Sequence, residues 1–280
     1  MQNQAKLPRQ NISSNTGNRR WSTLLRSPFF DIIQFIFLLT LSAWFLSKTL
    51  RESGYHWQWY QIPQYLFLFD DSGFHAGPLL LGLLITVKIS AVSLVLASAI
   101  GMATAMMQLS NSFVARTTAK IYVETIRNTP LLIQLFFIYF VLGPVLGLSR
   151  FPSAVLALSL FEGAYASEII RSGIVSIHRG QWEASYSLGM SNIDTYLTVI
   201  LPQAIRRILP PLTSQAISLI KDSALVSTIA IYDLTMQAQA IIAETYLTFE
   251  IWFTVALMYL AVTLTLSLIV RQMEHRFRMN

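Results

Sequence analysis

The stretch Gln181–Pro211, QWEASYSLGMSNIDTYLTVILPQAIRRILPP, separates two segments that are apolar enough to cross a bilayer. It is polar and is interrupted by glycine and proline, so it is unsuited to lipid, where backbone groups must be satisfied within a regular segment. Gln181–Leu188 predicts two helical turns, and Gly189 can take the left-handed conformation that ends a helix. Ser191 predicts the N-cap of a second helix, with Asp194 completing a capping box. We therefore expect two short helices at a bend outside the membrane.

The second short helix is expected to run from about residue 192 to 201, because Pro202 weakens its continuation. Pro210-Pro211 predicts another break, with Pro211 suited to the first turn of the next helix. A helix of this length is marginal in water, so its apolar face needs a host. The host is the rest of this chain, another protein chain or the lipid surface, and the scarcity of Lys and Arg on the polar face favours a protein. The apolar face comprises Gly189, Ile193, Tyr196, Leu197 and Ile200.

The composition of the 280 residues indicates an integral membrane protein. Hydrophobic residues make up 54% and charged residues 12%, whereas soluble domains carry about 25% charged residues. The absence of cysteine excludes disulfides and thiolate metal sites. The polar start of the chain has no apolar core that would indicate a cleaved signal peptide. Six segments reach the length of a bilayer crossing and are expected to be helices: 29–47, 79–108, 131–148, 152–171, 209–231 and 250–270.

The distribution of positive charge predicts the orientation of these spans. If the N-terminus is cytoplasmic, most of the 20 Lys and Arg residues lie in the inner connections, and both termini are inside. The basic residues behind the net charge of +6 then set the orientation of the spans and contact anionic lipid, so nucleic acid is not an expected partner. The outer segment 48–78 is rich in Trp and Tyr, which favours an interfacial aromatic belt over a ligand site.

The quoted stretch resembles the EAA loop of ABC importer permeases. In that family EAA is followed by three residues and glycine, then nine residues, isoleucine, one residue and Leu-Pro. Here Glu183-Ala184-Ser185, Gly189 and Leu201-Pro202 keep every spacing, while Ser185 and Val199 depart from the pattern. The resemblance implies that Glu183, Ala184, Gly189, Ile193, Tyr196, Leu201 and Pro202 couple the chain to an ATPase.

Other motifs resemble the polar amino acid permeases of type I importers and cover about residues 79–275. They are the run Gly163–Ile174, Gly180-Gln181 with Leu201–Ala204, Lys221-Asp222-Ser223 with Leu225, and Glu124 followed by Arg127–Leu132 with Gln134. The resemblance implies an all-α integral membrane protein with one extra N-terminal helix, a five-helix core and a cytoplasmic coupling helix. The expected divisions are a cytoplasmic tail at 1–28, the extra helix and aromatic segment at 29–78, the permease domain at 79–275 with its EAA loop at 181–203, and a cytoplasmic tail at 276–280.

The family resemblance also implies the partners. It predicts two ATP-binding subunits, a second permease chain that is a copy or a relative, an external solute-binding protein and a polar amino acid as substrate, in the bacterial inner membrane. A phosphate loop requires Gly-Lys before Ser or Thr, and this chain contains no Gly-Lys. We therefore expect no enzyme activity and no cofactor in this chain, with ATP and Mg bound by the partner ATPase.

Five charged residues fall within or near predicted spans and should face protein or water, because a charge in lipid is costly. Glu162 lies near mid-span without a local partner and suits a contact with a substrate ammonium. Lys221 and Asp222 are interpreted as a structural pair or gate, and Lys88 as a side chain that extends outward. Glu168 is expected to pair with Arg171 three residues on.

An alternative function from the sequence is a secondary transporter or channel driven by an ion gradient. Such proteins often contain internal repeats, and no clear repeat is found here. A membrane enzyme is not supported, because the chain has neither a catalytic constellation nor metal-binding His spacing. The sequence does not name the amino acid that is transported.

Overall fold

The computed structural model describes residues 28–52, 54–70 and 73–279. Within these limits the chain forms two units, divided between Trp57 and Gln58. Most of the expected N-terminal tail lies outside the described residues. The first unit contains the helix α2 (Pro28–Glu52), whose residues Asp31–Phe45 form an apolar run. Its large side chains are exposed all along this run, as expected for a helix in lipid.

The second unit begins with the aromatic segment that precedes the helix α4 (Pro78–Leu109). It contains a 3₁₀ turn η1 (Trp59–Gln61), a short helix α3 (Pro63–Leu66) and a hairpin of β1 (Phe67–Asp70) and β2 (Gly73–Ala76). The strands pair antiparallel, and the rings of Phe67 and Phe74 lie 5.6 Å apart across the hairpin. The backbone N–H of Gln58 donates to the buried Glu250 carboxylate at 2.7 Å. This bond ties the segment to the start of the last helix.

Three helices are each long and apolar enough to cross a membrane: α4 (Pro78–Leu109), α8 (Arg150–Val175) and α13 (Thr248–Met279), the last through residues 248–272. Glycines let α4 and α8 approach closely: a Cβ at Gly101 would lie 2.7 Å from Ala166 Cβ, and one at Gly163 would lie 2.8 Å from Ile100 Cγ2. The helix α13 continues to Met279 and so includes most of the expected cytoplasmic tail at 276–280.

The segment after α4 differs from the expectation. Residues 113–127, interpreted as part of an inner connection, form the helix α5 (Phe113–Arg127). The predicted span 131–148 is built from α6 (Leu131–Phe136), a π-helical turn η2 (Phe137–Leu142) and α7 (Gly143–Leu146). The helical segment 131–146 is bent by 107° from α5. The two segments are long and apolar enough to cross a membrane only when they are counted as one span. The charged residues of α5 concealed the helix, because its amphipathic pattern lacks the apolar length of a membrane span.

The quoted stretch forms α9 (Arg179–Ser187), α10 (Asn192–Asp194), a π-helical turn η3 (Thr195–Ile200) and α11 (Leu201–Asp222). The expected breaks at Pro202 and at Pro210-Pro211 are wrong, because all three prolines lie within one continuous helical path. A proline removes one backbone hydrogen bond, and packing of α11 against α8 and α13 outweighs this loss. A 3₁₀ segment η4 (Ser223–Ile229) and α12 (Leu234–Thr245) follow.

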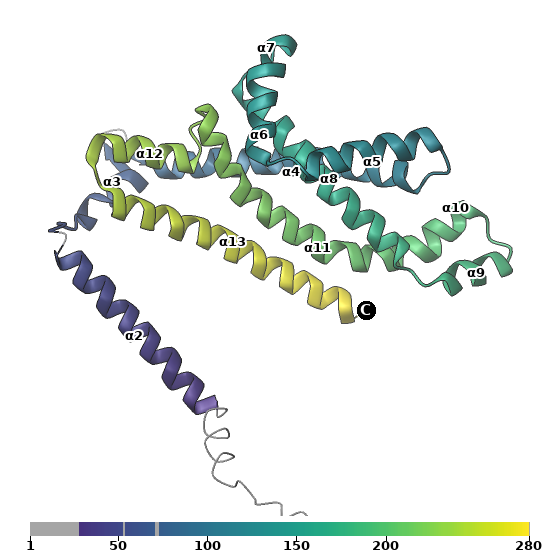
Figure 1. The fold of residues 1–280 in the computed structure, drawn as a ribbon, viewed down its shortest axis with the longest axis horizontal. Coiled ribbons are helices and arrows are strands. Elements are labelled where there is room, and N and C mark those ends of the chain that lie inside the picture. Colours follow the sequence, from purple (N-terminus) through teal and green to yellow (C-terminus); the bar gives the residue numbers. More distant parts are fainter. Residues whose placement is uncertain (1–27, 53, 71–72, 280) are drawn as a thin grey trace, which may run out of the picture. The chain divides into compact units, whose positions relative to one another are not determined.

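The helix count predicted from sequence is therefore not settled by the fold. Three helices of the described residues qualify as spans alone, and up to five if each bent pair counts as one. The second bent pair joins residues 192–229 to α12 at 49°. Figure 1 shows α8 and α11 running toward α9 and α10 at one end, while α6 and α7 project away from the neighbouring helices. Ile170, Ile174, Ile200, Ala204 and Ile208 form a core between α8 and α11 next to this end.

Candidate coupling segment and polar cavity

Beside the EAA segment, residues 181–203, the helix α11 is joined to the end of α8. The Arg207 Nη1 donates to the backbone oxygen of Ser176 at 2.6 Å and to its Oγ at 3.0 Å. His178 caps α9, since its Nδ1 accepts from Gly180 N–H at 3.0 Å. Gln203 Nε2 donates to Gln181 Oε1 at 3.1 Å, which joins the two ends of the segment. The segment is thus held as a defined bend.

The bend follows the local pattern predicted from sequence. Gly189 has φ +74, the left-handed conformation that ends α9, and Met190 N–H donates to Ser185 O at 3.2 Å. Ser191 Oγ accepts from Asp194 N–H at 3.2 Å and donates to its carboxylate at 2.6 Å. These contacts confirm the predicted helix end and the N-cap of the next helix. Ser185, which stands where the family has alanine, is buried and donates to Gln181 O at 2.7 Å.

The apolar face predicted for the second helix is divided in two. Tyr196 is half-buried and its ring meets Trp182 edge-on at 4.8 Å, while Ile200 is fully buried. Ile193 and Leu197 instead remain 71% and 61% exposed. The π-helical turn explains the division, because i→i+5 bonding adds residues to each turn and rotates later side chains relative to earlier ones. The expectation of one shared face was wrong for this reason.

Leu188 extends the exposed apolar surface and was missed from sequence. It is 81% exposed and directly precedes the glycine that ends α9. We name Leu188, Ile193 and Leu197 the apolar patch.

Among the predicted coupling residues, Glu183, Ala184, Gly189, Ile193 and Pro202 are exposed, whereas Tyr196 and Leu201 are half-buried. Glu183 forms an ion pair with Arg179 at 3.1 Å, with side chains 66% and 90% exposed.

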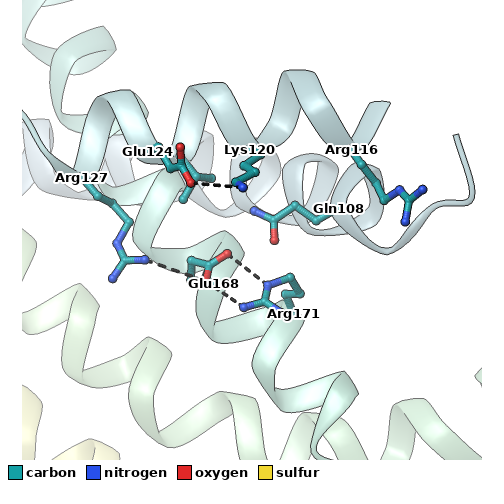
Figure 2. A pocket seen from close by; sticks show the side chains of 8 residues that line it. Gln108, Arg116, Lys120, Glu124, Arg127, Glu168 and Arg171 are labelled. Atoms are coloured by element: carbon teal, nitrogen blue, oxygen red, sulfur yellow. Dashed lines mark hydrogen bonds and ion pairs between the residues drawn. The ribbon is translucent and has the colours of Figure 1, made fainter. Parts of the chain in front are cut away.

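A second feature is a polar cavity of about 370 Å³ between α4, α5 and α8. Arg171 makes a bidentate contact with Glu168, with N–O distances of 3.1 and 2.9 Å. Arg127 Nη1 adds a longer contact of 3.8 Å to the same carboxylate, and its guanidinium lies 5.2 Å from the centre of the Tyr165 ring. Figure 2 shows these groups converging from α5 and α8. The lining consists of Gln108, Arg116, Lys120, Val123, Glu124, Arg127, Glu168 and Arg171.

The structure therefore brings Glu168 and Arg171 together as an ion pair. Sequence reasoning missed that Arg116, Lys120 and Gln108 share this cavity. In the sequence, Arg116 and Lys120 count only among the basic residues of an inner connection, and Gln108 is only the last residue of the predicted span 79–108. Their spacing of four residues on α5 places Arg116 and Lys120 on one face, which was the available signal.

The other predicted intramembrane charges lie apart from the polar cavity. Glu162 is 2% exposed, and its Oε1 has no hydrogen-bond partner among the described residues. Gln215 and Asp222 of α11 are its neighbours. Lys221 is exposed at the end of α11. Lys88 Nζ lies 5.5 Å from the centre of the Phe151 ring. In the part of the chain that the structure describes, no group of His, Asp and Glu could hold a metal ion.

Comparison with known families identifies the class that this fold defines. The family model for "Binding-protein-dependent transport system inner membrane component" matches residues 97–279. The chain belongs to this family. It is a membrane transport component of the ABC importer class, and not an enzyme. The predicted resemblance to ABC permeases for amino acids is confirmed, as is the all-α membrane fold.

Curated relatives and solved structures agree with this assignment. The glutamine transport system permease protein GlnP of Escherichia coli K12 is 41% identical over 207 residues, covering 72% of this chain and 94% of GlnP. The L-cystine transport system permease protein TcyB of Bacillus subtilis is 41% identical over 198 residues, covering 70% and 84%. A crystal structure of an amino acid ABC transporter with histidines aligns with a TM-score of 0.68 at 38% identity, over 71% of this chain and 94% of that one. The inward-facing MetNI methionine transporter, at 19% identity and a TM-score of 0.60 over 71% and 95%, shares the fold.

Proposed function

We propose that this chain carries a polar amino acid into the cell across a bacterial inner membrane, driven by a separate ATPase to which the EAA segment couples it. Relatives whose names specify glutamine and L-cystine support an amino acid substrate. ATP and Mg bind in the partner ATPase, consistent with the lack of a phosphate loop in this chain.

The observation that carries the proposal is the apolar patch on a firmly held polar segment. Leu188, Ile193 and Leu197 are mostly exposed although the chain has an adjacent core that buries Ile200. Exposed apolar groups on a rigid support are suited to entering a pocket of a partner, where a few such side chains supply most of the binding energy. Because a hydrogen bond links α9 to α11 and another links α11 to the end of α8, movement of the partner would pass to these helices.

The remaining parts of the proposed assembly follow from family and charge. Both termini lie in the cytoplasm, since that orientation places most Lys and Arg residues inside. Two ATPase subunits, a second permease chain and an external solute-binding protein complete the importer. The division of the chain into an extra helix at 29–78 and a permease domain at 79–275 belongs to the same proposal.

We assign Glu162, Lys221 and Asp222 to the substrate path or its gate, with Lys88 near its outer part. Glu162 is the strongest of these assignments. One of its two carboxylate oxygens, Oε1, is buried without a hydrogen-bond partner in the described residues, although Gln215 lies beside the carboxylate, and a charge held within a bundle requires a partner or water. A substrate ammonium would meet that need. The ion pair between Glu168 and Arg171 has a structural role in this scheme.

Reconstitution with the cognate ATPase tests the proposal. Replacing Ile193 and Leu197 by alanine should reduce ATP-driven uptake and stimulated ATP turnover by more than tenfold, on the scale of lost interface hot spots. Val95→Ala, which removes an exposed apolar side chain on α4 instead, is the matched control. Unaltered turnover after replacement of both Glu183 and Gly189 would contradict docking through this segment. Uptake that persists without ATP and collapses with a protonophore would instead establish an ion-driven transporter.

A further inference from the structure

The polar cavity carries more positive than negative charge. Its cations are Arg116, Lys120, Arg127 and Arg171, and its only carboxylates are Glu124 and Glu168. Glu168 is engaged by Arg171 and Arg127, and Glu124 lies 3.7 Å from Lys120. Arg116 has no ion-pair partner among the described residues. Figure 2 shows its guanidinium at the end of the cavity away from Glu168. The lining therefore has surplus positive charge and a free guanidinium.

This charge composition selects the kind of ligand. A zwitterionic amino acid needs both a free cation and a free anion in its site, because its ammonium and carboxylate are both charged. The cavity has a free cation, but both of its carboxylates are already paired. The geometry therefore suits an anionic group. A phosphate fits best, because guanidinium groups bind phosphate oxygens through paired N–H donors.

The surroundings of Arg116 indicate where the phosphate comes from. Arg116 lies in the first turn of α5, directly after the connection from α4. Phe113 and Val114 begin the same turn and are 75% and 72% exposed. A guanidinium beside exposed apolar side chains matches an amphiphile, with the phosphate on the charges and the acyl chains on the apolar residues. On the proposed orientation, on which this inference rests, the site faces the inner leaflet, where basic pockets between helices bind lipid headgroups.

We propose that the polar cavity binds the phosphate of an anionic phospholipid headgroup, held chiefly by Arg116. The volume of about 370 Å³ falls in the range of small-ligand sites. Arg171 and Arg127 form the inner wall, where Glu168 fixes their guanidinium groups. The bound lipid would connect α4, α5 and α8 beside the point where α8 leads into the EAA segment.

Native mass spectrometry of the full chain with its ATPase tests this proposal. The complex is placed in nanodiscs of phosphatidylcholine containing a minor fraction of phosphatidylglycerol, and the retained phosphatidylglycerol is counted. Arg116→Gln should reduce its retention about fivefold, the effect of removing one basic contact to an anionic surface. Arg116→Lys should keep most of it. Arg206→Gln, which removes an exposed arginine of α11 outside the cavity, should leave retention unchanged.

The control measurements separate this inference from the transport proposal. Melting in phosphatidylcholine alone should be the same for wild type and Arg116→Gln, which shows that the variant folds. Equal retention of phosphatidylglycerol by both proteins would overturn the lipid site. Melting is also measured in phosphatidylcholine discs with inorganic phosphate or a free amino acid added. If either one raises the melting temperature of wild type but not of Arg116→Gln, the site takes a soluble ligand and the lipid site is overturned. ATP-driven uptake is measured on the same preparations, so failure of the lipid site leaves the transport result intact.

Discussion

The apolar patch of the EAA segment and the polar cavity lie near the same end of α8. In each region the side chains differ in polarity from the residues around them. The patch exposes leucine and isoleucine on a segment too polar for the membrane, whereas the cavity holds four cations beside long apolar helices. Ordinary folding would bury the first set and avoid the second. On the proposals made above, the patch binds an apolar surface of the ATPase and the cavity binds an anion.

The two regions also differ in what holds them. The helices that flank the EAA segment depend on close packing, because Gly173 of α8 lets Ile208 of α11 approach so closely that an added Cβ would clash with Ile208 Cγ1. The polar cavity depends on charge, through the bidentate pair of Glu168 and Arg171. Substitutions that remove packing and substitutions that remove charge should therefore affect the two regions separately.

The largest effect is expected from Gly173→Val, which forces α8 and α11 apart below the EAA segment. Overpacking of this kind should lower the free energy of unfolding by about 1–3 kcal/mol. Thermal melting of the purified chain measures the loss. Val175→Ala, an exposed position two residues on, is the control and should change stability by less than about 0.5 kcal/mol. If both variants melt like wild type, the close contact between α8 and α11 does not anchor the segment.

The next largest effect is expected from Trp182→Ala, which removes the ring that fixes α9 against Tyr196. The edge-on contact itself contributes about 0.5–1.5 kcal/mol beyond simple burial. ATP-driven uptake should fall while lipid retention in the polar cavity stays unchanged. Trp182→Phe should restore most of the uptake, because it keeps a ring in the same place. A parallel loss of phosphatidylglycerol would show that the two regions are not independent.

Local sequence patterns predicted parts of these regions that depend on neighbouring residues. Gly189 and Ser191 ended and started helices as expected, because their conformations are set within a few residues. Pro202 did not break its helix, because contacts of α11 with distant helices outweigh a local preference. Tyr196 is half-buried and Ile193 exposed because of a π-helical turn, which no residue type in the sequence predicts. The cavity joins residues from three helices, and one sequence contains no direct signal of that juxtaposition.

A smaller effect with an informative sign is expected from Glu168→Gln. The ion pairs it removes are partly solvent-exposed, so the free energy of unfolding should fall by only about 0.5–1 kcal/mol. The same change frees Arg171 and Arg127 and increases the surplus positive charge of the cavity. Retention of phosphatidylglycerol should therefore rise, while stimulated ATP turnover stays near wild type. Reduced retention would mean that the fixed geometry of the two guanidinium groups matters more for the lipid than their free charge.

The smallest effect on stability is expected from Glu183→Ala, and it separates folding from docking most clearly. The side chains of Glu183 and Arg179 are mostly exposed, and ion pairs of this kind contribute little, about 0–0.5 kcal/mol. Melting should therefore be unchanged, so any loss of ATP-driven uptake would not come from unfolding of the chain. Arg179→Ala removes the same pair from the other side and is the matched control. A loss with Glu183→Ala but not with Arg179→Ala would assign the carboxylate to the ATPase interface, whereas equal losses would assign the effect to the pair itself.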